Sequence, residues 1–196
     1  MPNSPPSANW VEALCSTIAE STSAMKRWAV RLSFVMIASV AEEGVDCSPR
    51  GDPKGQLVRI VDRKTVLLPD RNGNNRADTL RNIVRDGRCA LLFLIPGVGE
   101  AMRINGRAEL SVDPELLQSF AIHGKLPRSV IVVHVERVYF QCPKALVRSR
   151  LWDPESRVPR SSLPTVGQMI AALSNGTFDG EEYDRNYPER LAKTIY

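Results

Sequence analysis

Residues 89–110 read CALLFLIPGVGEAMRINGRAEL, and this stretch indicates the fold class. Its first part, Cys89–Ile95, is almost wholly apolar, as is typical of a strand that is covered on both faces. Pro96 and Gly97 interrupt the run, and from Ala101 to Leu110 apolar and polar residues then alternate, as in a strand with one buried face. Two strands joined by so short a turn predict an antiparallel hairpin.

More short β-rich runs lie on both sides of this hairpin, and few helical patterns separate them. Roughly six or seven strands with short connections favour an antiparallel barrel over a doubly wound parallel sheet. The predicted fold is therefore mainly β, with flanking helices. The further predicted strands are Ser33–Val40, Leu57–Val61, Thr65–Leu68 and Ser129–Phe140.

Two of the connections carry a helical pattern, Asn75–Asp86 and Asp113–Phe120. For the first helix, Asn74 or Asn75 is suited to cap the N-terminus, because a short polar side chain can accept a bond from the first-turn amides. Gly87 stands where a glycine commonly ends a helix.

The two ends of the chain differ in composition from its middle. Residues 1–29 hold a Pro-containing leader and an amphipathic helical pattern from Trp10 to Lys26. Residues 30–154 hold the predicted strands and form the expected barrel domain. Residues 155–196 are expected to be an extension that packs on the barrel or on a partner, with a short helix at Val166–Leu173 and a polar end.

The composition excludes several classes of protein. With 43% hydrophobic and 24% charged residues the 196-residue chain is of ordinary globular type, and its net charge of +4 is too small to indicate a nucleic-acid partner. No apolar run approaches the roughly 20 residues of a membrane span, and the N-terminus lacks the pattern of a signal peptide. We therefore expect a soluble, cytoplasmic protein without a membrane partner.

Metal binding is not expected either. The four cysteines form no CxxC pair, and only His123 and His134 offer imidazole, so the paired spacing of a zinc site is missing. Cys89 and Cys142 lie in or beside apolar runs, which predicts buried free thiols.

The segment from Ser48 to Arg81 is chemically the most informative. A predicted strand ends at Asp70, and a polar loop then leads into a helix. A helix N-terminus presents free amides and the positive end of the dipole, and Arg71 and Arg76 bracket this one. The residues alone fit an anion site and a solvated arginine-rich turn equally well.

The order of motifs in this part of the chain resembles the flavin-binding core of the pyridoxamine 5'-phosphate oxidase superfamily. Ser48–Asp52 (SPRGD) stands where that family has the strand that lines the flavin ring. Leu67–Asp70 and the loop Asn72–Arg76 stand where it has a strand followed by its phosphate-binding run. The stretch Arg103–Ala108 and the tail Lys144–Trp152 match further along.

The resemblance spans roughly residues 30–154 and implies a split β-barrel that dimerises and binds FMN at the subunit interface. It implies that Asn74, Asn75 and Arg76 hold the phosphate, helped by Arg71 or Arg50. Ser48, Pro49 and Arg50 would follow the isoalloxazine ring, and Trp152 with Arg148 would close the pocket from the partner subunit. The implied cofactor-binding residues are Ser48, Pro49, Arg50, Gly51, Pro69, Asp70, Arg71, Asn74, Asn75, Arg76, Arg148, Ser149 and Trp152.

The implied activity is FMN-dependent electron or hydride transfer with a small molecule, and no catalytic side chain is assigned, because the flavin carries the chemistry. Ala101 stands where the vitamin oxidase has a glutamine beside the ring, which argues against pyridoxamine phosphate as the substrate. Three alternatives stay open: a non-enzymatic module that stores or senses flavin, a haem-binding barrel with His123 or His134 as axial ligand, and a deazaflavin enzyme.

Overall fold

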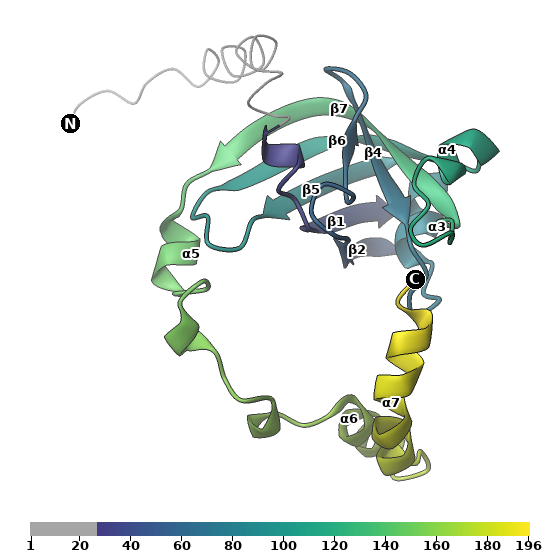
Figure 1. Cartoon of the computed structure of the whole chain (residues 1–196), viewed down its shortest axis with the longest axis vertical. Coiled ribbons are helices and arrows are strands. Elements are labelled where there is room, and N and C mark those ends of the chain that lie inside the picture. The colour runs from purple at the N-terminus through teal and green to yellow at the C-terminus, as the bar shows by residue number, and fades with distance from the viewer. Residues whose placement is uncertain (1–26) are drawn as a thin grey trace. The chain divides into compact units, whose positions relative to one another are not determined.

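The computed structural model describes residues 27–196, so the helix predicted for Trp10–Lys26 lies outside the described residues. The chain divides into two compact units (Figure 1). The barrel unit comprises the described residues up to Arg71 together with Arg76–Trp152. The C-terminal unit comprises Asn72–Asn75 and Asp153–Tyr196.

The barrel unit is built on one seven-stranded sheet with the strand order β2-β1-β5-β6-β7-β4-β3. Every strand pair is antiparallel, and β5 and β6 form the hairpin predicted from residues 89–110. The predicted fold class, mainly β with flanking helices, is confirmed. The strands are β1 Phe34–Ala41, β2 Gly44–Gly51, β3 Arg59–Ile60, β4 Thr65–Asp70, β5 Arg88–Leu94, β6 Ala101–Ser111 and β7 Ser129–Gln141.

Alternation along the strands sends one face of the sheet into the core. On β5, Leu91 and Phe93 are fully buried, whereas their neighbours Leu92 and Leu94 are only half-buried. The expectation that this strand is covered on both faces is therefore wrong for the single chain. Its outward side is apolar, which is why the sequence reads as an uninterrupted hydrophobic run.

Helix α3 (Asp78–Arg85) lies against β1, β2 and β6 and places Thr79 and Ile83 in the interior. Its N-cap is Ala77, which makes no side-chain bond to the first turn, so the prediction of an Asn74 or Asn75 cap is wrong. Asn75 instead adopts a left-handed backbone with φ of 60°. Gly87 follows the helix with φ of 81°, as predicted for a glycine at this end.

Two shorter helices complete the barrel unit. Helix α4 (Pro114–Gln118) is capped by Asp113, whose side chain accepts a hydrogen bond from the Leu116 amide. Together with Phe120 it forms a small second cluster with Leu67 of β4 and Val130 of β7. Helix α5 (Lys144–Arg148) follows β7.

The C-terminal unit contains α6 (Val166–Leu173) and α7 (Gly180–Thr194), preceded by two 3₁₀ turns, η1 (Pro154–Ser156) and η2 (Arg160–Ser162). Helix α6 coincides with its prediction, whereas no helix was predicted for the polar end that forms α7. Asp179 caps α7 by accepting a bond from the Glu182 amide at 2.8 Å.

Cys89 is buried as predicted, and burial with the nearby charge of Glu136 raises the pKa of its thiol to about 11. Cys142 is exposed, so its predicted burial is wrong, because it follows the end of β7 where the strand has left the core. Among residues 27–196, no helix has the length and apolar character needed to cross a bilayer.

Candidate functional site

The inward face of β2 is polar, unlike that of the strand beside it. Ser48 and Arg50 pair with Ile37 and Val35 of β1, so their side chains lie on the face where β1 is buried. Asp46 precedes them on the same face, and all three side chains are half-buried. Because β2 is the outermost strand of the sheet, this polar row lies at an accessible edge.

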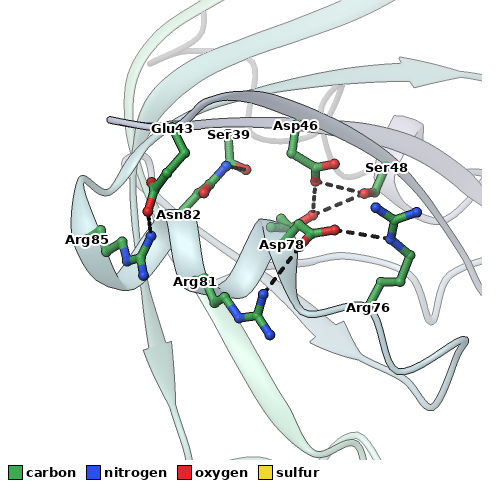
Figure 2. A network of polar contacts seen from close by, with 10 residues as sticks. Ser39, Glu43, Asp46, Ser48, Arg76, Asp78, Arg81, Asn82 and Arg85 are labelled. Atoms are coloured by element: carbon green, nitrogen blue, oxygen red, sulfur yellow. Dashed lines mark hydrogen bonds and ion pairs between the residues drawn. The ribbon is translucent and has the colours of Figure 1, made fainter.

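Helix α3 attaches to this row through hydroxyl groups (Figure 2). Asp46 Oδ2 accepts hydrogen bonds from Thr79 Oγ1 at 2.6 Å and from Ser48 Oγ at 2.9 Å. Further along the helix, Asn82 Nδ2 donates to Ser39 Oγ at 3.3 Å. The bond from Thr79 lowers the pKa of Asp46 most, and the bond from Ser48 and the charges of Arg50 and Arg76 lower it further, against the effect of burial.

Asp46 and Thr79 are not among the residues that the sequence singled out. The alternation Asp46, Ser48, Arg50 along one strand could have indicated the first of them. Nothing in the local sequence indicated Thr79, because its contact depends on where α3 packs.

The N-terminus of α3 is rich in charge. Arg76 Nε lies 3.1 Å from Asp78 Oδ2, and Arg81 Nη1 lies 3.5 Å from Asp78 Oδ1 (Figure 2). The Arg76 side chain is 77% exposed. Exposed ion pairs of this kind contribute little free energy, so Asp78 binds the two arginines only weakly. Asn74 and Asn75 belong to the C-terminal unit, and their part in this site stays a prediction.

The ends of β2 and β4 carry two further arginines with different surroundings. Arg71 Nε donates to Asp52 Oδ2 at 2.9 Å, and its Nη1 donates to the Phe120 carbonyl at 2.7 Å. Arg50 Nε lies 3.7 Å from Asp70 Oδ1, and its Nη1 donates to the Pro49 carbonyl at 2.9 Å. Burial raises the pKa of both Asp52 and Asp70, and the neighbouring arginines oppose that shift.

The predicted tail residues lie elsewhere in the barrel unit. Trp152 is half-buried, and its Nε1 donates to the Val98 carbonyl in the β5–β6 turn at 2.8 Å. Ser149 Oγ donates to the Leu146 carbonyl at 3.1 Å, and Arg148 is exposed at the end of α5. The structure therefore gathers Ser48, Arg50 and Arg76 around β2 and α3, and gives the tail its own contacts.

Comparison with known proteins supports this architecture. The family described as pyridoxamine 5'-phosphate oxidase matches residues 21–142. No protein with a curated description matches the chain.

Solved structures are similar at low identity. HupZ of group A Streptococcus is 21% identical, with 62% of this chain and 94% of that chain covered and a TM-score of 0.48. A Clostridium acetobutylicum protein related to general stress protein 26, of the pyridoxinephosphate oxidase family, is 12% identical. The match covers 65% of this chain and 89% of that chain, with a TM-score of 0.44. The FAD binding protein of Mycobacterium smegmatis is 13% identical, with 62% of this chain and 93% of that chain covered and a TM-score of 0.43. Because the family match spans more than half of the sequence, the chain belongs to the pyridoxamine 5'-phosphate oxidase family of flavin-binding split barrels.

Proposed function

We propose that this protein binds FMN and is an FMN-dependent oxidoreductase that acts on a small molecule. The observation that carries the proposal is the convergence of Arg50 and Arg76 on the polar row of β2. Arg50 lies on this row opposite Val35, and Arg76 directly precedes the N-cap of α3, the helix that binds Asp46 through Thr79. The charges of both arginines lower the pKa of Asp46. An elongated anion with a polar ring fits a site that offers two separate cations.

The phosphate end fits the N-terminus of α3. The first-turn amides receive no side-chain cap from Ala77, and a phosphate is a strong acceptor for such amides. Arg76 precedes the helix and is mostly exposed, so it can turn toward the phosphate. Asp78 is the competing anion at this position.

The ring end fits β2. The strand pairs only with β1 within the sheet, so its other edge carries backbone donors and acceptors that suit the polar edge of an isoalloxazine. Ser48, Pro49 and Arg50 lie along it, and the Arg50 charge is placed to influence the ring's electronics. FMN, when bound, supplies the redox chemistry, and the chain's residues bind and orient it.

The surroundings of Ala101 do not favour the oxidation of pyridoxamine phosphate. Ala101 is only 5% exposed and pairs with Gln141 in the sheet, so a buried methyl group stands where the family resemblance implies a ring-side glutamine. The substrate class is therefore left at a small molecule that exchanges electrons or hydride with the flavin.

A homodimer with FMN between the subunits belongs to the same proposal. Phe34 and Met36 of β1 pair with Leu94 and Leu92 of β5, and all four side chains are half-buried on the outward face of the sheet. Such a continuous apolar face suits contact with a second copy. Sedimentation of the FMN-loaded protein should give twice 21.8 kDa, and a monomer that still binds FMN would contradict the shared site.

Titration with FMN and riboflavin tests the proposal directly. We expect Arg76→Ala to weaken FMN binding by about 1.5–3 kcal/mol, the value of a charged hydrogen bond, and to leave riboflavin binding almost unchanged. Arg85→Ala is the matched control, because Arg85 lies on the same helix but pairs with Glu43 at its other end. Equal losses for both ligands would show that Arg76 does not hold the phosphate.

The absorption spectrum and reduction assays separate the alternatives. A flavin spectrum supports the proposal, a Soret band would replace it with haem binding, and binding of a deazaflavin alone would replace FMN. Reduction of the bound FMN by NADH or NADPH distinguishes an oxidoreductase from a module that only stores flavin.

A further inference from the structure

The tripeptide Arg50-Gly51-Asp52 meets the dipeptide Asp70-Arg71 in a reciprocal arrangement. Arg50 lies 3.7 Å from Asp70, and Arg71 lies 2.9 Å from Asp52, so each segment contributes one acid and one base. The sequence alone assigns the tripeptide no role apart from its place in the SPRGD motif. In the fold it forms one half of a two-armed ionic clamp, which we define as these four side chains.

The clamp joins strands that the backbone does not join. β2 is at one edge of the sheet, and β4 is separated from it by β1, β5, β6 and β7. Since no ladder hydrogen bonds connect the two strands, the contact between their ends depends on side chains. The clamp therefore links the end of β4 to the end of β2 where the proposed ring-binding residues lie.

The two arms of the clamp differ in how far the arginine side chain is buried and in how many of its N–H donors are engaged. In the inner arm, the Asp52 and Arg71 side chains are only 1% and 13% exposed, and Arg71 also holds the Phe120 carbonyl. In the outer arm, the Arg50 side chain is 19% exposed, and its Nη2 has no partner among residues 27–196. Arg71 engages both its Nε and its Nη1 in hydrogen bonds, whereas Arg50 engages only its Nη1, so the outer arm keeps more donors for a ligand.

Asp70 is held in place independently of Arg50. It is 8% exposed, its carbonyl accepts a bond from the Arg128 amide at 3.0 Å, and its partner across the sheet is Ser129. Ser129 Oγ is buried and makes no hydrogen bond within the described chain, so this hydroxyl does not compete for the carboxylate. A fixed, buried acid next to a half-exposed arginine restricts the arginine's rotamers.

We propose that Asp70 is a positioning residue, which holds Arg50 so that its free guanidinium edge meets the flavin ring along β2. The inference rests on the proposed function, and it changes the role of Asp70 from the cofactor contact implied by the family resemblance to an action through Arg50. Arg71 and Asp52 then hold the ends of β2 and β4 together and do not contact the cofactor.

Binding to FMN and riboflavin in four proteins tests the inference: the wild type, Asp70→Asn, Arg50→Met and the double variant. Asp70→Asn should lower the affinity for both ligands by the same factor, about fivefold to tenfold, because the isoalloxazine ring is common to both. In the Arg50→Met background it should cause no further loss. Asp70→Asn is expected to fold, since burial already disfavours the charged carboxylate. Asp62→Asn, an exposed acid in the β3–β4 turn, is the matched control.

Two results would overturn the inference. If Asp70→Asn lowers flavin affinity equally in the wild-type and Arg50→Met backgrounds, the carboxylate acts on the fold and not through Arg50. If only FMN affinity falls, the carboxylate acts at the phosphate. A readout without flavin keeps the test independent of the proposed function: phenylglyoxal should modify Arg50 faster in Asp70→Asn than in the wild type, measured by mass spectrometry with Arg85 as internal reference. If the wild type binds neither flavin, the proposed function fails, and an unchanged rate at Arg50 then also removes the positioning role.

Discussion

The barrel unit and the C-terminal unit are stabilised by different means. All the large hydrophobic side chains that are fully buried in the described chain, Phe93, Ile104 and Ile131 among them, belong to the barrel unit. In the C-terminal unit only Gly167 and Gly180 are buried. The barrel thus has a hydrophobic core, whereas the helix pair α6–α7 has none of its own.

Local interactions take the place of a core in the C-terminal unit. Thr165 and Gln168 form a reciprocal capping box at the start of α6. The Gly167 amide donates to Asp184 Oδ1 at 2.9 Å, and the Arg190 guanidinium lies 4.3 Å from the centre of the Tyr183 ring. Leu173 remains 86% exposed. The candidate site on β2 and α3 is therefore supported by the unit that has a hydrophobic core.

Removal of a core side chain should have the largest effect, and only on the barrel. Phe93 is fully buried in the main core cluster. Phe93→Ala leaves a cavity and should lower the free energy of unfolding by about 3–5 kcal/mol, measured by urea denaturation. Hydrogen exchange of the α6 and α7 amides should not change. Faster exchange in those helices would show that the two units unfold together.

Contact between the two C-terminal helices should be the next most sensitive feature. A methyl group on Gly167 would collide with the Gly180 carbonyl and would lie 2.7 Å from Asp184 Cγ. Gly167→Ala should therefore force the helices apart, cost about 1–3 kcal/mol, and speed hydrogen exchange in α6 and α7 only. Gly73→Ala is the matched control in the same unit, since nothing lies within 4 Å of its added methyl group. In both Gly167→Ala and Gly73→Ala, the β5 amides should exchange more slowly than the α6 amides, because only the barrel unit has a hydrophobic core. Loss of protection in β5 would contradict this difference between the units.

The strands of the barrel could be predicted from the sequence more completely than the candidate site. A continuous apolar run identified β5, and period-two alternation identified β6, because alternation directly reflects which face is buried. The Asn74 or Asn75 cap failed, since Asn75 takes a left-handed backbone and the helix starts later, after Ala77. Helix α7 was missed although Tyr183, Tyr187 and Leu191 recur at helical spacing, because the polar residues around them hide that pattern.

Arg71 and Arg50 show why the rest of the site could not be predicted. Arg71 follows Asp70 directly and Arg50 stands two residues before Asp52, and the family resemblance implies either arginine as a helper at the phosphate. Their difference arises from a contact between β2 and β4, which lie far apart in the strand order. Such nonlocal pairing decides which charge is buried and which remains available, and no local pattern contains it.

Trp152, the last residue of the barrel unit, offers the smallest expected effect. Its indole donates to the Val98 carbonyl at 2.8 Å, which a phenylalanine cannot do. Trp152→Phe should therefore lower the free energy of unfolding by about 1 kcal/mol. If the residue is an anchor of this kind, added FMN should quench the remaining tryptophan emission of the variant about as strongly as that of the wild type. Trp28→Phe is the control, because Trp28 packs against Phe140 in the same unit. Unchanged stability with loss of most of the quench would instead place Trp152 against a flavin, as the family resemblance implies.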